Sequence, residues 1–172
     1  MIDIAHTWDG QPLGASDVAR VGWQLDEAVL RIWVDAPFHD DPPPPGPPGP
    51  TPGLWNHEVV ELFLVGAGPH YTEIELSPHG HHLVLRLEGV RQAVASELPL
   101  QLAARREATR WQAEAVLSRS LLPDDILSFN AFRIHGVGAH RRYLAHAPVP
   151  GPMPDFHRLG LFPRWPGPST AS

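Results

Sequence analysis

Residues 54–65 read Leu-Trp-Asn-His-Glu-Val-Val-Glu-Leu-Phe-Leu-Val, residues 70–76 read His-Tyr-Thr-Glu-Ile-Glu-Leu, and residues 82–87 read His-Leu-Val-Leu-Arg-Leu. All three runs are rich in β-branched, aromatic and aliphatic residues, and short Gly/Pro clusters separate them. This pattern is typical of a three-stranded antiparallel meander. The meander decides the fold class and carries the polar residues of most interest.

Successive side chains of a strand point to opposite faces of the sheet. In the middle run this places Tyr71, Glu73 and Glu75 on one face and Ile74 and Leu76 on the other. Applied to all three runs, the alternation predicts an apolar face directed at the core and a second face that carries Glu61, Glu73, Glu75, His82 and Arg86. Such a row of carboxylates and imidazoles is either a solvated surface or a ligand site.

The remaining chain predicts further short strands and hardly any helix. Apolar and polar residues alternate over residues 23–36, 101–105, 111–117, 129–135 and 143–146. The chain of 172 residues, with 21 prolines and 15 glycines, suits one all-β domain, an antiparallel β-sandwich. We place this domain at residues 1–162, with a proline-rich, extended surface loop at 42–53 and a flexible tail at 163–172.

Charge and composition narrow the function classes. A net charge of −6 without a Lys/Arg cluster argues against nucleic-acid binding and against binding to anionic membranes. There is no cysteine, so disulfides and thiolate chemistry are excluded. The N-terminal residues have neither a basic flank nor a long apolar segment, and no apolar run is long enough to span a membrane. We therefore expect a cytoplasmic protein, a monomer or a homodimer.

Two segments carry a family resemblance. The first is Trp-Asn-His-Glu-Val-Val-Glu-Leu-Phe-Leu at 55–64, followed by Ile-Glu-Leu-Ser-Pro-His-Gly at 74–80. The second is Tyr-Leu-Ala-His-Ala-Pro-Val at 143–149, followed by Pro-Asp-Phe-His-Arg at 154–158. Both resemble family 9 carbohydrate-binding modules, a DOMON-like β-sandwich group. The chain is also similar, from His6 to Phe162, to a group of small bacterial and animal proteins with a His-Thr-Trp-Asp-Gly start.

The resemblance implies a sugar site on a concave sheet face. Trp55 would stack on a sugar ring, and Glu61 and Glu75 would accept hydrogen bonds from its hydroxyls. The second aromatic wall of those modules falls at His146 here, where an imidazole offers less stacking area than an indole. The expected site therefore comprises Trp55, Glu61, Glu73, Glu75, His79, His82, Arg133, Tyr143 and His146.

Other functions stay open at this point. His79 and His82 with Glu73 or Glu75 could bind a transition metal, and the resemblance includes haem-binding relatives, so a small metal- or haem-dependent enzyme is the alternative. Arg133 could instead pair with a glutamate across the sheet and turn the site into a salt-bridge network. The proline-rich loop could contact a protein partner. We favour non-catalytic binding of a small sugar or related polar metabolite, without a cofactor.

Overall fold

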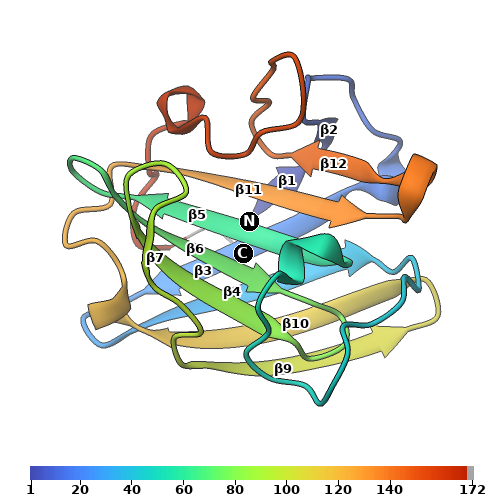
Figure 1. Ribbon diagram of the computed structural model, residues 1–172, viewed down its shortest axis with the longest axis horizontal. Helices are drawn as coiled ribbons and strands as arrows, with labels where there is room; N and C mark the ends of the chain where they lie inside the picture. Colours follow the sequence, from blue (N-terminus) through green and yellow to red (C-terminus); the bar gives the residue numbers. More distant parts are fainter. Residues whose placement is uncertain (170–172) are drawn as a thin grey trace.

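The computed structural model describes residues 1–169 and shows two antiparallel sheets packed face to face (Figure 1). The five-stranded sheet has the order β1-β3-β4-β10-β9 and the seven-stranded sheet the order β2-β12-β11-β5-β6-β7-β8. The strands of the first sheet are β1 (Ile2–Ile4), β3 (Ala19–Leu25), β4 (Val29–Pro37), β9 (Leu100–Glu107) and β10 (Arg110–Ser118). Those of the second are β2 (His6–Thr7), β5 (Val59–Val65), β6 (His70–Leu76), β7 (His82–Glu88), β8 (Ala93–Ala95), β11 (Ser128–His135) and β12 (Arg142–Ala145).

Helical structure in the described part of the chain consists of single 3₁₀ turns. These are η1 (Ala15–Asp17), η2 (Leu54–Asn56), η3 (Arg119–Leu121), η4 (Gly138–His140) and η5 (Leu159–Leu161). Within residues 1–169, none of these turns has the length and apolar character needed to cross a bilayer. The predicted antiparallel β-sandwich is confirmed.

The main core fills the space between the sheets. Trp23, Ile32 and Trp111 of the five-stranded sheet pack there with Leu62 and Ile74 of the seven-stranded sheet, and all are buried. A side chain of each sheet reaches this layer at every second strand position, as the alternation in the sequence predicts. Burial of these large apolar surfaces is the dominant stabilising contribution of the fold.

A second apolar cluster covers the outer face of the seven-stranded sheet. Phe63 of β5 and Phe132 of β11 pack there against Val149, Phe156 and Phe162 of the segment that follows β12. The Phe132 and Phe156 rings are stacked with their centroids 4.0 Å apart. The polar face expected from the sequence is therefore partly covered by residues 149–162, which we call the C-terminal cover.

Several strand predictions need correction. The meander of β5, β6 and β7 is confirmed, and the alternating segments at 101–105 and 111–117 form the antiparallel pair β9–β10. The strand expected over residues 23–36 is instead a hairpin of β3 and β4. Its turn is held by Asp26, whose Oδ1 accepts hydrogen bonds from the N–H groups of Ala28 and Val29, both at 2.8 Å.

The boundary predicted after Phe162 lies too early. Trp165 stacks on Trp23 with the ring centroids 4.7 Å apart, and the backbone N–H of Trp165 donates to the Leu127 carbonyl at 2.9 Å. The N–H of Leu25 donates to the Pro168 carbonyl. Residues 163–168 are therefore part of the packed sandwich, and the end of the predicted tail, residues 170–172, lies outside the described residues.

Candidate functional site

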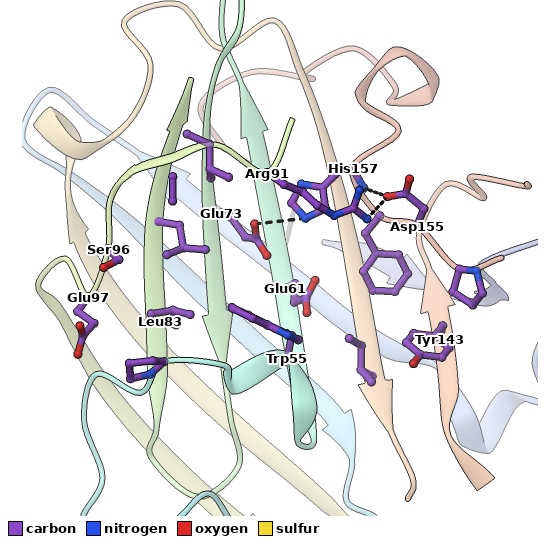
Figure 2. Close-up of a pocket in the computed structure, with 17 residues that line it drawn as sticks. Trp55, Glu61, Glu73, Leu83, Arg91, Ser96, Glu97, Tyr143, Asp155 and His157 are labelled. Atoms are coloured by element: carbon purple, nitrogen blue, oxygen red, sulfur yellow. Dashed lines mark hydrogen bonds and ion pairs between the residues drawn. The ribbon is translucent and has the colours of Figure 1, made fainter. Parts of the chain in front are cut away.

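A pocket of about 610 Å³ opens on the outer face of the seven-stranded sheet, beside the C-terminal cover (Figure 2). Leu83, Leu85 and Leu87 of β7 form an apolar part of its floor, while Glu61 of β5 and Glu73 of β6 contribute carboxyl groups. Its walls come from residues distant in the sequence, namely Pro52, Trp55, Arg91, Ala93, Ser96, Glu97, Ile134, Tyr143, Pro154, Asp155, Phe156 and His157. Both the volume and the mixture of apolar surface with few polar groups suit a small-molecule site.

Strand register brings three glutamates together below this pocket. Glu61 and Glu75 are directly opposite each other on β5 and β6. Glu73 lies two positions before Glu75 on β6 and points to the same face. Opposite residues in an antiparallel pair have Cβ atoms about 4.5–5.5 Å apart. The three side chains are only 2%, 4% and 0% exposed for Glu61, Glu73 and Glu75.

Most carboxyl oxygens of this triad have no hydrogen-bond partner among the described residues, although the Trp55 backbone N–H opposes the rise in the Glu75 pKa. Glu61 Oε1, Glu73 Oε2 and both carboxyl oxygens of Glu75 are buried and unpaired. Burial raises the pKa of Glu73 to about 8. Burial followed by the Glu73 charge raises the pKa of Glu61, and burial followed by the Glu61 and Glu73 charges raises that of Glu75, both well above the ordinary value. All three shifts favour the protonated form of the carboxyl group, and the buried oxygens have unused hydrogen-bonding capacity.

The position of Trp55 follows from the turn that carries it. Gly53 starts η2 with a φ of 72°, a conformation that glycine adopts without strain, and Leu54 is fully buried beneath the turn. The guanidinium of Arg141 donates hydrogen bonds to the carbonyls of Trp55 and Asn56. Held in this way, the Trp55 side chain remains 45% exposed at the pocket, next to Glu61 (Figure 2).

A polar chain closes the pocket on the opposite side. Arg91 donates to Asp155 with an N–O distance of 2.6 Å. The Tyr71 hydroxyl lies 2.8 Å from His157 Nδ1, and His157 Nε2 lies 3.9 Å from Glu73 Oε2. Burial, followed by the Arg91 charge, lowers the pKa of His157 to about 4, so the imidazole is neutral at neutral pH.

The structure brings together only part of the site expected from the sequence. Trp55, Glu61, Glu73 and Tyr143 line the pocket, and Glu75 lies buried on the same sheet face. His79, His82, Arg133 and His146 do not line it.

His82 was expected on the glutamate face, and this is wrong. It is opposite Leu76 in the register of β6 and β7, which places it on the inner face, and Arg86 shares that face opposite Thr72. Leu83, Leu85 and Leu87 lie on the glutamate face instead. His79 lies in the turn before β7, with Nδ1 3.1 Å from a guanidinium nitrogen of Arg106 on β9.

Arg133 and His146 also point away from the pocket. Arg133 is buried on the inner face, where it donates to the carbonyls of Asp17 and Pro37, both at 3.1 Å. It therefore makes no network with the triad. His146 Nδ1 lies 2.8 Å from the Asp3 carbonyl and its ring stacks on Phe129, so it provides no second wall. Tyr143 and Phe156 are the aromatic residues opposite Trp55.

The metal alternative is not supported by the geometry. Across residues 1–169, no three His, Asp or Glu side chains are grouped so that they could hold a metal ion. His79 and His82 are separated from Glu73 and Glu75 because they lie on the other side of the sheet or in the turn at its edge.

Arg91, Asp155, Phe156 and His157 line the pocket but were not among the site residues expected from the sequence. His157 is held there by its contact with the Tyr71 hydroxyl of β6. The one signal in the sequence was the Pro-Asp-Phe-His stretch at 154–157, which belongs to the resemblance noted above.

No protein-family model matches this sequence. The mouse protein named UPF0462 protein C4orf33 homolog is 44% identical over 168 residues, covering 92% of this chain and 87% of the mouse protein. The zebrafish homolog is 43% identical over 168 residues, with 92% and 85% covered, and the human UPF0462 protein C4orf33 is 43% identical, with 92% and 84% covered.

One solved structure shares the fold at low sequence identity. It is a crystal structure from Bacteroides uniformis described as a "putative carbohydrate-binding protein", with a TM-score of 0.66 and 14% identity. The match covers 84% of this chain and 76% of that chain. At this identity the likeness shows the β-sandwich fold alone.

Proposed function

The chain belongs to the UPF0462 family, and from this premise we propose that it binds a small carbohydrate or a related polar metabolite in the pocket beside Trp55. The observation that carries the proposal is the pairing of an exposed indole with unpaired, buried carboxyl groups in one pocket. A sugar ring presents a C–H face that suits stacking on Trp55 and hydroxyls that can exchange hydrogen bonds with Glu61 and Glu73.

The proposal also draws support from two similarities. The resemblance to family 9 carbohydrate-binding modules puts Trp55 and Glu61 at sugar-contacting positions, and both line the pocket. The fold neighbour from Bacteroides uniformis is itself described as a "putative carbohydrate-binding protein". The binding is proposed to be non-catalytic, because burial raises the pKa of both Glu61 and Glu73 instead of dividing them into one acid and one base.

A thermal-shift screen of neutral mono- and oligosaccharides tests the proposal. We expect at least one sugar to raise the melting temperature of the wild type, and Trp55→Ala to weaken its binding about tenfold through loss of the stacking surface. Trp33→Ala is the matched control, because Trp33 is 37% exposed on the other sheet, away from the pocket. Equal shifts for the wild type and Trp55→Ala would contradict the role of Trp55, and the absence of any shift would contradict the proposal.

A further inference from the structure

The pocket has an excess of acidic groups. Its lining contains four carboxyl side chains, Glu61, Glu73, Glu97 and Asp155, and one guanidinium, Arg91. That guanidinium is already paired with Asp155 at 2.6 Å. His157 is neutral near pH 7, so it adds no compensating charge. Wherever these carboxyl groups ionise, they would repel an anionic ligand such as a phosphate and attract a cation.

The pocket contains buried carboxyl groups whose oxygens have no hydrogen-bond partner among the described residues. Glu61 and Glu73 are at least nine-tenths buried and each leaves one oxygen unpaired, and Glu75 lies directly opposite Glu61. Arg141, the other guanidinium near Glu61, directs its N–H groups to the carbonyls of Trp55 and Asn56. Unpaired buried carboxyl groups are costly, and a ligand that donates several hydrogen bonds removes that cost.

Aromatic residues surround these carboxyl groups. Trp55, Tyr143 and Phe156 line the pocket together with Glu61 and Glu73, and the rings of Tyr143 and Phe156 are in edge-to-face contact with their centroids 6.0 Å apart. Aromatic faces attract ammonium groups, and indole does so most strongly. Carboxylates within an aromatic pocket are therefore a combination that favours a cationic ligand over a neutral one.

We propose that the ligand carries a protonated amine, whose ammonium group is held by Glu61 and Glu73 while its sugar or polyol skeleton lies against Trp55 and Tyr143. An amino sugar is the chemical class that satisfies both halves of the pocket. This inference rests on the proposed function, since it names the class of ligand for the same site.

Binding of an ammonium group would change the protonation of the pocket. The titratable and charged groups that face Glu61 and Glu73 are Glu75 of β6, Arg91 and Glu97 beside β8, Tyr143 of β12, Arg141 before it, and Asp155, His157 and Tyr71 on the cover side. The Arg141 and Arg91 charges lower the pKa of Glu61 and of Glu73, but the effect of burial is larger and both pKa values remain raised. An arriving ammonium group stabilises the ionised carboxylate, so one carboxyl group loses its proton to solvent when the ligand binds.

Matched pairs of hexoses and 2-amino-hexoses (glucose, galactose and mannose against glucosamine, galactosamine and mannosamine) test this, with calorimetry in two buffers of different ionisation enthalpy at neutral pH. We expect at least one amino sugar to bind about tenfold more tightly than its parent hexose and to release protons. Glu61→Gln keeps the shape of the site and should remove both the preference and the proton release. Glu114→Gln, an exposed carboxyl group on β10, should change neither.

The outcomes separate the inference from the proposed function. Hexoses that bind as tightly as their amino counterparts, without proton release, would overturn the amine inference and leave sugar binding intact. Glu61-dependent binding of ethanolamine, with no binding of any sugar, would keep the ammonium site and overturn carbohydrate binding. If none of these compounds binds at millimolar concentration, both proposals are wrong.

Discussion

The Tyr71 hydroxyl joins three segments that are distant in the sequence. It accepts a hydrogen bond from the backbone N–H of Arg91 at 3.0 Å and lies 2.8 Å from His157 Nδ1. Because the hydroxyl accepts from Arg91, it is free to donate to His157, and we assign to His157 the tautomer with its proton on Nε2, facing Glu73. One residue of β6 thus positions both the turn after β7 and the C-terminal wall of the pocket.

We predict that Tyr71→Phe lowers the free energy of unfolding by about 2 kcal/mol, because two partly buried hydrogen bonds are lost without a change in ring packing. Urea denaturation measures the change, and hydrogen exchange should show faster opening at residues 155–157. Tyr143→Phe is the control, since the Tyr143 hydroxyl makes no hydrogen bond to any described residue. Comparable losses for the two variants would argue against the bridging role.

At the scale of the elements, strand positions could be predicted from the sequence but strand faces only in part. Alternation located β5 and β6 and separated Glu61, Glu73 and Glu75 from the core residues correctly. It failed at β7, where it predicted Leu83 on the core face and His82 on the polar face. Both faces of β7 are covered, one by the second sheet and the other by the pocket region, so apolarity does not distinguish them. Only the pairing of Leu83 with Glu75 does.

The composition of the C-terminal segment did not predict that the segment packs on the sandwich. Pro, Gly and Ser predict a frayed end, but the segment contains Trp165, whose ring packs on Trp23 and meets Phe129 edge-on 5.5 Å away. Trp23 Nε1 also donates to the Gly167 carbonyl at 3.1 Å. A single aromatic residue therefore anchors a segment whose composition is that of a linker.

We predict that Trp165→Ala lowers the free energy of unfolding by about 2–3 kcal/mol, somewhat less than for a fully buried tryptophan. Trp33→Ala, at an exposed position on β4, should cost less than about 1 kcal/mol. Thermal and urea unfolding measure both. A change at Trp165 no larger than at Trp33 would mean that the tail contributes little and that the domain does end at Phe162.

At the scale of the whole molecule, the pocket is a product of tertiary structure. The glutamates belong to the meander, and Trp55 lies in the turn η2 just before β5, so their proximity could be predicted from strand geometry. Arg91, Asp155 and His157 arrive from a turn and from the C-terminal cover, and no periodicity in the sequence relates them to β6. The same cover converts a sheet face that looks solvated in the sequence into a desolvated site.

This desolvation predicts an unusual pH dependence of global stability. A carboxyl group whose native pKa is raised binds more protons in the folded than in the unfolded state between the two values. The group therefore makes its full contribution to the free energy of unfolding below its unfolded pKa of 4.5. That contribution is lost as the pH rises toward and through the native pKa, which is about 8 for Glu73. His157 acts oppositely, but only between its native pKa of about 4 and its ordinary value of 6.5.

Between pH 6.5 and 8, His157 no longer contributes to the pH dependence of stability, so the raised carboxyl groups dominate it. Glu58 belongs to these groups, because burial raises its pKa to about 7. We predict that the free energy of unfolding falls across this window, with a slope of up to about 1.4 kcal/mol per pH unit for each group that titrates. Glu73→Gln should flatten the slope and stabilise the protein at the alkaline end, whereas Glu114→Gln should leave it unchanged. Urea denaturation at several pH values measures the slope, and a stability that is constant or rises over this interval would show that the triad is already ionised in the folded state. Such a result would also remove the proton release expected when an amine binds, so this measurement on the ligand-free protein is an independent check on the charge state of the pocket.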